Sequence, residues 1–412
     1  MSSRDSILVI GAGMAGLACA RTLAAAGSSV RVIESSDRVG GRLGSSLING
    51  TWCDLGFQVS MSNYSCLESL VPREVVKRHS FIDGAVVWDG AVHVRVIDPK
   101  RSPLSVLDPI RRGLVGWRDI RGAARCRRWA RSLKRGDTHP GTAMDVIRRA
   151  GFREHFIEAF LRPFFGGVFL DETLSVSSHR FLKTLDRFAT GHAELPHEGM
   201  QQLAEAMADP IRDRIELGCR VDSLDGDGGV VLADGSHVEG KQLVLALPWD
   251  ATAHLLGMES LVSSASWSGT TAVHFKFKKT SSDALPPLIH LNGSGSGQVN
   301  LVCSPSAVAS GYVEDGWQTM LVSLKPGGDR SSQIDLDVVR TQAGVVMGID
   351  SSQWQHVATS FIPDGLPAGD LSRLKCGLPP KVSVAGDWTG DPSIEQAVLS
   401  GVDVADGLLA GG

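Results

Sequence analysis

Residues 7–16 read ILVIGAGMAG, an apolar run followed by three glycines in the spacing GxGxxG. The run predicts a buried parallel strand over Ile7–Ile10. The glycines predict a tight turn at Gly11, close approach of a ligand at Gly13, and contact between helix and strand at Gly16. Because a helix follows at once, its free N–H groups and the positive end of its dipole are placed to bind a pyrophosphate.

A second strand and an acidic residue complete this unit. Val30–Ile33 predicts the strand, and Glu34 follows it directly. At this spacing a carboxylate meets the ribose hydroxyls of an adenine dinucleotide and disfavours a 2′-phosphate. The chain has 47 glycines, so a GxGxxG could arise by chance, but a strand, a helix and Glu34 in register make that the weaker interpretation. The sequence therefore predicts an adenine-dinucleotide pocket.

Length and composition exclude several classes of protein. With 412 residues the chain is long enough for two domains, and its net charge of -4 gives no general attraction to nucleic acid. Its seven cysteines contain no CxxC pair, so we expect neither a metal site nor a disulfide framework. The sequence shows no charged and then apolar leader and no apolar run of about eighteen residues, so we expect a cytoplasmic protein.

Beyond the first unit, the pattern departs from a regular alternation of strand and helix. Val86–Val94 and Val230–Val238, each broken by Asp-Gly, predict two β-hairpins. Leu243–Leu247, stopped by Pro248, predicts a strand that returns to the parallel sheet. Thr142–Phe160 predicts one capped helix with an apolar face.

A later segment predicts an antiparallel sheet. Val273–Lys278 alternates apolar and polar residues, so we expect a strand whose polar face, with Lys276 and Lys278, is solvated. The glycine-rich residues 293–297 lie between strands and predict a flexible connection. The candidate partner strands are Gln298–Cys303, Thr319–Leu324 and His356–Phe361, with a helix over Gln333–Met347.

One segment is strongly basic. Residues 100–135 hold twelve Lys or Arg against two Asp, with apolar residues at roughly helical spacing. This pattern suits an amphipathic surface that meets a membrane or an anionic substrate, or else the solvated side of ordinary helices. The second interpretation is favoured because glycines and a proline interrupt the segment. A peripheral membrane contact stays open.

A second glycine pair with an arginine, Gly40-Gly41-Arg42, stands just past Glu34. A nicotinamide pocket has no need of this group, whereas a flavin dinucleotide can be held by a second close backbone approach and a guanidinium. With these residues the chain resembles the flavin amine oxidase superfamily, which includes monoamine and polyamine oxidases, protoporphyrinogen oxidase and the phytoene desaturases. The resemblance implies that the cofactor is FAD.

Further segments carry the same resemblance over nearly the whole chain. Residues 54–58 (DLGFQ) are similar to the segment that lies near the isoalloxazine ring, and Val221 to the valine whose backbone meets the adenine. Residues 384–397, in which Gly386-Asp387 precedes a helix, resemble the last flavin motif. The implied cofactor-binding residues are Gly11, Gly13, Met14, Ala15, Gly16, Glu34, Ser35, Gly40, Gly41, Arg42, Gly56, Phe57, Gln58, Val221, Leu247, Gly386, Asp387, Ser393, Ile394 and Ala397.

The chain departs from the amine oxidases it resembles. Ser393 stands where those enzymes have one of two aromatic residues that flank the flavin, and residues 269–271 (GTT) lack the lysine that holds a water at flavin N5. Gln396 replaces a common glycine, and Trp354 and Trp388 are expected in the core. These departures favour the desaturase and porphyrinogen oxidase members. No cysteine stands at the covalent link of monoamine oxidases, so we expect non-covalent FAD.

The expected fold is α/β, with a Rossmann-type FAD domain and an inserted, mixed α+β substrate domain. The FAD domain is expected to comprise residues 1–60, 195–262 and 375–412, and the substrate domain residues 61–194 and 263–374. The expected function is dehydrogenation of a largely apolar small molecule by hydride transfer to flavin N5. Dioxygen or a quinone would then accept the electrons.

Several functions stay open beside this one. They are oxidation of an amine, isomerisation by a flavin without net redox change, and FAD binding without catalysis. Residues 160–169 resemble a segment of desaturase-like members, and they would either line the substrate domain or form an elbow between two helices. No catalytic residue is assigned, and the candidate general bases are His79, His155, His179, His192 and His197.

Overall fold

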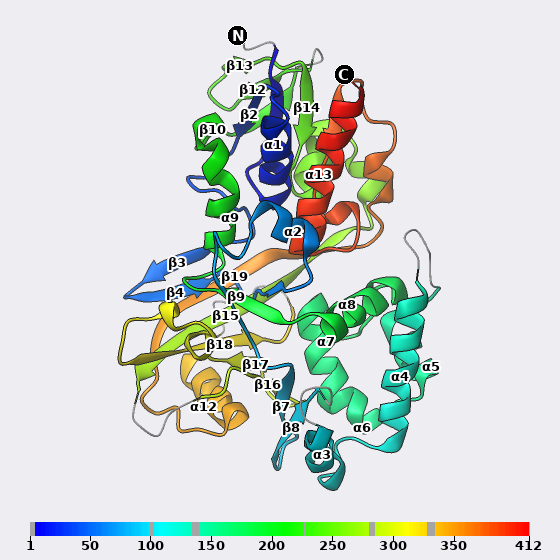
Figure 1. Cartoon of the computed structure of the whole chain (residues 1–412), viewed down its shortest axis with the longest axis vertical. Helices are drawn as coiled ribbons and strands as arrows, with labels where there is room; N and C mark the ends of the chain where they lie inside the picture. Colours follow the sequence, from blue (N-terminus) through cyan, green and yellow to red (C-terminus); the bar gives the residue numbers. More distant parts are fainter. Residues whose placement is uncertain are drawn as a thin grey trace.

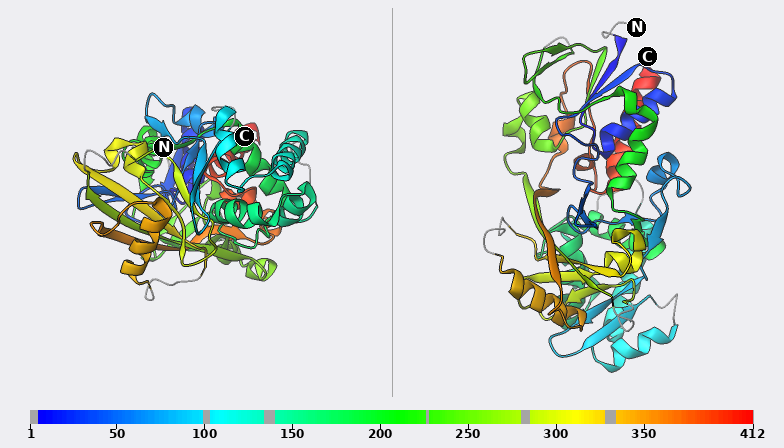
Figure 2. Two further views of the ribbon diagram at one scale, coloured as in Figure 1. Left: turned by 90° about the horizontal axis from the view of Figure 1, so that it is seen from below. Right: turned by 90° about the vertical axis from the view of Figure 1, so that its left-hand side faces the viewer.

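The computed structural model describes residues 5–98, 103–133, 140–225, 228–279, 285–327 and 334–411. The chain is a mixed α/β protein built around two main sheets (Figure 1). A parallel sheet lies near both chain ends, at the top of that view, and a larger sheet lies below it beside a group of helices. Figure 2 shows the larger sheet and the helical group next to one another from below. Over the described ranges, no helix is long and apolar enough to cross a membrane.

The parallel sheet has five strands in the order β10 (Ile215–Glu216), β2 (Val30–Ile33), β1 (Ile7–Ile10), β14 (Gln242–Leu245) and β20 (Val382–Val384). Their apolar residues are buried, as expected for a parallel sheet covered by helices. The helices beside it are α1 (Met14–Ala25), α9 (Gln201–Ala208) and α13 (Ile394–Gly411). Helices α1 and α13 pack so closely that a β-carbon on Gly401 would lie 2.1 Å from the carbonyl oxygen of Ala15.

The larger sheet has seven strands in the order β19 (Gln355–Ala368), β15 (Ser266–Lys278), β18 (Trp317–Leu324), β17 (Val299–Cys303), β16 (Ile289–Asn292), β7 (Gly84–Trp88) and β8 (His93–Ile97). All neighbours in it are antiparallel except β16 and β7. Helix α12 (Leu336–Met347) packs on this sheet through Val339, Ala343 and Val346.

The helical group has its own apolar core. Phe165, Phe169 and Phe181 lie at its centre and are almost fully buried. Its helices are α3 (Leu107–Arg111), α4 (Trp117–Ser132), α5 (Ala143–Ala150), α6 (Glu154–Phe156), α7 (Arg162–Phe169) and α8 (Ser178–Thr190). A π-helical turn over Ile157–Leu161 joins α6 to α7.

Short elements connect these parts. Strands β3 (Ser45–Ile48) and β4 (Thr51–Asp54) form a hairpin. One three-stranded sheet has the order β5 (Ser60–Met61), β9 (Ala193–Pro196) and β6 (Arg78–Ser80). The other has the order β11 (Val221–Leu224), β12 (Val230–Leu232) and β13 (His237–Val238). The remaining α-helices in the described ranges are α2 (Ser65–Leu70), α10 (Trp249–Leu256) and α11 (Pro305–Val308).

The strands predicted from the sequence are present. The two Asp-Gly hairpins are β7 with β8 and β12 with β13, and β14 returns to the parallel sheet beside β1. Strands β18 and β19 flank β15 directly, and β17 pairs with β18. The helix predicted over Gln333–Met347 begins at Leu336. Residues 100–102, 134–135 and 333 lie outside the described residues.

The single helix predicted over Thr142–Phe160 is wrong. Thr142 caps α5 as predicted, since its side chain accepts the N–H of Asp145, but α5 ends at Ala150. Gly151 follows with φ +83, and a left-handed glycine closes a helix because it needs no β-carbon. The alternative of an elbow within residues 160–169 is also wrong, because Gly166 and Gly167 lie inside α7.

The solvated face predicted for β15 is covered by the hairpin of β3 and β4. His274 is buried, with Nε2 3.1 Å from the carbonyl oxygen of Asp54, and burial lowers its pKa to about 4. The ammonium of Lys276 donates to the carbonyl of Asn49, and its side chain is only 12% exposed. Lys278, farther along the strand, is exposed as predicted.

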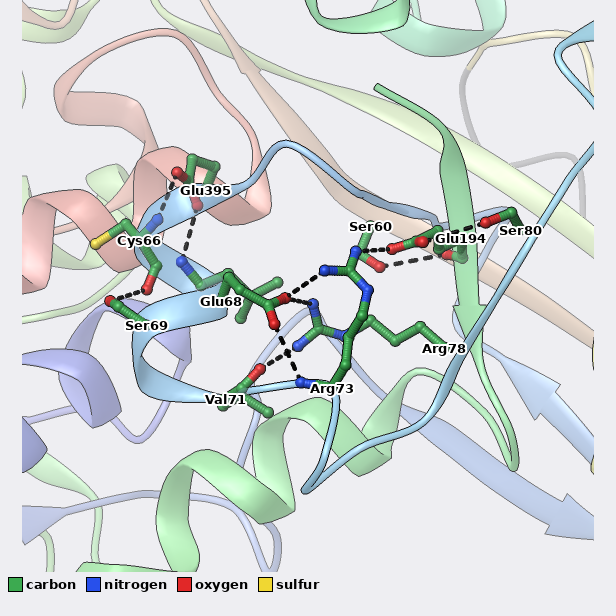
Figure 3. Close-up of polar contacts among 11 residues, drawn as sticks. Ser60, Cys66, Glu68, Ser69, Val71, Arg73, Arg78, Ser80, Glu194 and Glu395 are labelled. Carbon is green, nitrogen blue, oxygen red and sulfur yellow. Dashed lines mark hydrogen bonds and ion pairs between the residues drawn. The ribbon is translucent and has the colours of Figure 1, made fainter. Parts of the chain in front are cut away.

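A partly buried network of charged residues, in which Arg78 and Glu194 are the buried members, ties α2 to β6 and β9 (Figure 3). The guanidinium groups of Arg73 and Arg78 both contact the Glu68 carboxylate, at 2.8 and 2.9 Å. Arg73 also contacts the buried Glu194, at 2.6 Å. On the other side of α2, the carboxylate of Glu395, from α13, accepts two backbone N–H groups of the first turn.

Candidate functional site

A cavity of about 1320 Å³ opens at the carboxyl ends of the parallel strands. Gly11 follows β1, Glu34 follows β2, Leu247 comes shortly after β14 and Asp387 shortly after β20, and all four line the cavity. Ligands of open α/β sheets bind at this edge, where helix N-termini also point. The cavity extends from here to the helical group.

The three glycines of the first turn have different surroundings. Gly11 has φ +103, and a β-carbon there would lie 2.6 Å from the carbonyl oxygen of Ala246. A β-carbon on Gly16 would lie 1.9 Å from the carbonyl oxygen of Gly11, which is why the helix can pack on the strand only with glycine here. By contrast, a β-carbon on Gly13 would meet nothing within 4 Å. The chain itself requires Gly11 and Gly16, whereas bare backbone at Gly13 serves the cavity.

Glu34 is held rigidly at the edge of the cavity. It is buried, and one carboxylate oxygen accepts the backbone N–H of Ala12 at 2.7 Å. The other accepts the backbone N–H and the hydroxyl of Ser36, both at 2.8 Å. The turn after β1 and the end of β2 are therefore joined through this carboxylate.

The second glycine pair lies directly against the first turn. The N–H of Gly40 donates to the carbonyl oxygen of Ala12 at 2.8 Å, and a β-carbon on Gly41 would lie 3.4 Å from the Cα of Gly13. The next residue, Arg42, forms a 2.5 Å ion pair with Asp387, so the beginning and the end of the chain meet at this point. Two motifs predicted from separate stretches of sequence thus form one wall.

Gln58 brings an unpartnered acceptor into this wall. Its Nε2 donates to the carbonyl oxygen of Arg42 at 2.8 Å, whereas its buried Oε1 has no hydrogen-bond partner among the described residues.

The structure brings 19 of the 20 predicted cofactor-binding residues into the lining of this cavity; the exception is Gly16, which packs behind the turn.

These features fit FAD. The first turn of α1 has no side-chain cap, and its residues Met14 and Ala15 line the cavity, so backbone N–H groups are available to a pyrophosphate. Bare backbone at Gly13 leaves room for that group, and the free Oε1 of Gln58 can accept a hydrogen bond from a ligand N–H. At the other end, Ser393 caps α13, its hydroxyl accepting the N–H of Gln396 at 3.1 Å.

The part of the cavity within the helical group is lined with phenylalanines. Phe152, Phe156, Phe160 and Phe164 follow one another at intervals of four residues, with ring centroids 5.8, 5.1 and 5.9 Å apart. Phe188 of α8 stands against the last of them, at 5.1 Å. We call this part the apolar arm; it is lined by Phe152, Phe156, Phe160, Phe164, Phe181, Leu185 and Phe188.

The tryptophans are in the core, as predicted. Trp388 is buried and its Nε1 donates to the carbonyl oxygen of Leu247, and Trp354 packs between Phe275 and Phe277. Neither lines the cavity. Thr270, in the segment without a lysine, does line it.

The five candidate histidines lie elsewhere. Within the described residues none of them lines the cavity. His79 and His197 contact each other at 3.2 Å, and His192 pairs with Asp83 at 2.8 Å. Over the same residues, no group of three or more His, Cys, Asp or Glu could hold a metal ion.

Sequence reasoning missed several residues of this site. Arg127, Arg180, Lys183 and Arg187 line the cavity at the apolar arm. Arg180 and Arg187 were unmarked in the sequence because isolated arginines on a helix are usually solvated. The spacing of four residues between successive phenylalanines from Phe152 is visible in the sequence, and it could have indicated that these rings share one helix face.

Comparison with known proteins identifies the family. The model of the family described as "Flavin containing amine oxidoreductase" matches residues 14–409. A Mycobacterium tuberculosis protein named "Putative flavin-containing monoamine oxidase AofH" is 26% identical over 271 residues. That match covers 61% of this chain and 58% of that protein. A 4,4'-diapolycopene oxygenase of a Methylomonas species is 34% identical over 105 residues, which cover 21% of this chain and 20% of that protein.

Solved structures agree on the fold. A triple mutant of putrescine oxidase superposes with a TM-score of 0.77 over 99% of both chains, at 17% identity. The match of the family model over most of the chain, together with this fold, confirms the resemblance first indicated by the glycine motifs. The chain therefore belongs to the flavin-containing amine oxidoreductase family, whose members are FAD-dependent oxidoreductases.

Proposed function

We propose that this protein dehydrogenates a largely apolar small molecule with non-covalently bound FAD. The observation that carries the proposal is the apolar arm, the phenylalanine-lined part of the same cavity that opens at the edge of the parallel sheet. Such walls bury aliphatic or polyene chains, at about 25 cal/mol for each Å² of apolar surface removed from water. The sequence similarity to a diapolycopene oxygenase supports the same class of substrate.

The cofactor would be held by the residues that line the edge of the sheet. Gly13 and the N-terminus of α1 would bind the pyrophosphate, Glu34 the adenosine ribose and Val221 the adenine. Arg42 and Asp387 would close the site from the other side. Bound FAD supplies the chemistry by accepting a hydride at N5, with dioxygen or a quinone as the final electron acceptor.

The chain's own contribution is to orient the substrate and to keep water out. We propose that residues 1–60, 195–262 and 375–412 form the FAD domain, and that residues 61–194 and 263–374 form the substrate domain. The strands of the parallel sheet all come from the first set, and those of the seven-stranded sheet from the second. The rings of the apolar arm would exclude water from the reacting carbon.

Amine oxidation is the second candidate, and the similarity to AofH favours it. Two residues that line the cavity stand against it. Ser393 occupies the position where amine oxidases have an aromatic residue, and Thr270 belongs to the segment that lacks their lysine. Anaerobic bleaching of the bound flavin separates the candidates. Bleaching by a polyene or a porphyrinogen supports the proposal, bleaching by amines alone refutes it, and turnover only with pre-reduced flavin indicates an isomerase.

Changing Phe164 tests the apolar arm. Phe164→Asn is expected to lower kcat/KM for the bleaching substrate by about 10- to 100-fold, because a polar group replaces an apolar side chain worth about 1.5–3 kcal/mol on burial. Phe164→Leu, which keeps the wall apolar, is expected to change it by less than about threefold. Steady-state kinetics on FAD-saturated protein give both values. Equal losses in the two variants would mean that the polarity of the arm does not matter.

We also propose that the segment around α3 and α4 meets a membrane surface. Leu104, Leu107 and Trp117 are 76%, 56% and 74% exposed, and Arg111 and Arg118, which are close to them in sequence, are exposed too. Exposed apolar side chains that alternate with arginines along the chain suit an anionic bilayer. Helix α3, which begins at Leu107, lies at the end of the molecule farthest from both termini (Figure 1), and Leu104 and Trp117 flank it in sequence.

Vesicle sedimentation checks this surface. We expect binding to vesicles of phosphatidylcholine with phosphatidylserine and weaker binding to phosphatidylcholine alone. Trp117→Ser is expected to lower the affinity for the anionic vesicles by about tenfold, because it removes an aromatic side chain that the bilayer would bury. Leu47→Ser, which removes an exposed leucine on β3, is the matched control. Equal recovery of both variants on anionic vesicles would contradict the proposal.

A further inference from the structure

Arg180 is a buried cation in the wall of the cavity. It belongs to the first turn of α8, is only 9% exposed, and lines the cavity beside the apolar arm. Its guanidinium lies over the ring of Phe169, with the central carbon 5.2 Å from the ring centroid. In the part of the chain that the structure describes, this guanidinium has neither an ion pair nor a hydrogen bond; the backbone N–H of Arg180 bonds to the hydroxyl of Ser177.

The acids whose charges act on Arg180 are already engaged. Burial lowers the pKa of its guanidinium, and the charges of Asp391, Asp387 and Asp171 oppose that effect. The Asp171 carboxylate accepts hydrogen bonds from the hydroxyls of Thr173 and Ser175. Asp391 lies 3.2 Å from the ammonium of Lys183, and Asp387 is paired with Arg42 at 2.5 Å. Within the described residues none of these carboxylates forms an ion pair with Arg180, so its guanidinium has no direct counter-ion.

A guanidinium buried without a direct partner is costly unless a ligand supplies the partner. It presents five N–H donors in a planar fork that matches the two oxygens of a carboxylate. We propose that Arg180 binds a carboxylate of the substrate, so that the substrate is a molecule with an apolar body in the apolar arm and a carboxylate at Arg180. This inference rests on the proposed function and names the polar end of its substrate.

The surroundings favour a carboxylate over a phosphate. Arg180 offers one buried positive charge beside the aromatic rings, whereas Arg127, Lys183 and Arg187 are half-buried or exposed. A single negative charge on the ligand balances this buried charge. A phosphate dianion would leave an excess charge among phenylalanines, at a large desolvation cost. The same cation also explains why an alkylamine would be a poor ligand, because its ammonium would face a like charge in a site of low dielectric.

Three probes of equal chain length test the inference on the FAD-saturated protein. Dodecanoate, 1-dodecanol and dodecylamine are titrated, and binding is followed by the change in flavin absorbance and by calorimetry. We expect dodecanoate to bind at least about tenfold more tightly than the alcohol, and the amine most weakly. Arg180→Met is expected to weaken dodecanoate by about 30-fold or more while the alcohol changes by less than about threefold.

Two further variants complete the design. Arg180→Lys keeps the charge but loses the fork, and we expect an intermediate affinity for dodecanoate. Arg149→Met, at an exposed arginine of α5 outside the cavity and outside the proposed membrane surface, is expected to leave all three affinities unchanged. If Arg180→Met does not fold, the lysine variant and the preferences of the unmodified protein still decide.

Each failure has a different signature. If dodecanoate and 1-dodecanol bind the unmodified protein equally, the role of Arg180 is overturned and the apolar arm stands. If none of the three probes binds, the proposal of an apolar substrate in the apolar arm is contradicted, and the inference about Arg180 with it. Loss of bound FAD in Arg180→Met, at unchanged stability of the FAD-free protein, would assign this cation to the cofactor and also overturn the inference.

Discussion

Gly13→Val is expected to abolish FAD binding without unfolding the protein. A β-carbon at this position meets nothing within 4 Å, and the backbone there, with φ -71 and ψ 173, is open to any L-residue. The added side chain would therefore fold into place and project into the cavity at the N-terminus of α1. A pyrophosphate needs close backbone approach at this point, so we expect affinity to fall by at least about a hundredfold, or about 2.7 kcal/mol.

The measurements are the flavin content after purification and a titration of the FAD-free protein with FAD. The matched control is Gly407→Val, in the exposed end of α13, where a β-carbon also meets nothing within 4 Å. That variant should bind FAD normally, since valine is a better helix residue than glycine and the position is remote from the cavity. A yellow Gly13→Val protein with unchanged affinity would disprove the assignment of this turn to the cofactor.

Gly11 behaves differently, and the contrast explains what the sequence could predict. A β-carbon on Gly11 would collide with the carbonyl oxygen of Ala246, just after β14, so this glycine is required by the chain with or without a ligand. Gly13 is required only if a ligand approaches. Both requirements are local, set by a strand, a turn and a helix close together in sequence, and local constraints leave a readable pattern. The residues that line the cavity at the edge of the parallel sheet were therefore predictable one by one.

The apolar arm was not predictable in the same way. Phenylalanines at helical spacing look the same whether they face a core or a cavity, and only the packing of α8 against α7 decides which. Gly151 could have stood inside a helix or ended one, and its left-handed conformation shows that it ends α5. The burial of His274 depends on the hairpin of β3 and β4, more than two hundred residues earlier in the chain. No sequence pattern marks Arg180, because what sets it apart is that its guanidinium has no ion-pair or hydrogen-bond partner among the described residues of the folded chain.

Arg78→Met is expected to destabilise the protein by about 3 kcal/mol, because it removes a fully buried cation and leaves its partners in place. The side chain of Arg78 is 0% exposed, and it donates to the Glu68 carboxylate and to the carbonyl oxygen of Val71 (Figure 3). After the substitution, Arg73 alone faces two carboxylates, Glu68 and Glu194, and the carbonyl of Val71 loses its donor. Methionine fills the space of the stem but replaces none of these bonds.

Urea unfolding of FAD-free protein measures this loss, with Arg212→Met as the control. Arg212 also contacts two acids, Glu205 and Asp209, but on the surface, where such pairs contribute at most about 1 kcal/mol. A comparable loss in both variants would mean that the network near α2 behaves as a surface cluster. The first turn of α2 also donates two N–H groups to Glu395, at the start of α13, which lines the cavity. A large loss of unfolding free energy in Arg78→Met alone would therefore mean that this network stabilises the helix α2 on which the start of α13 packs.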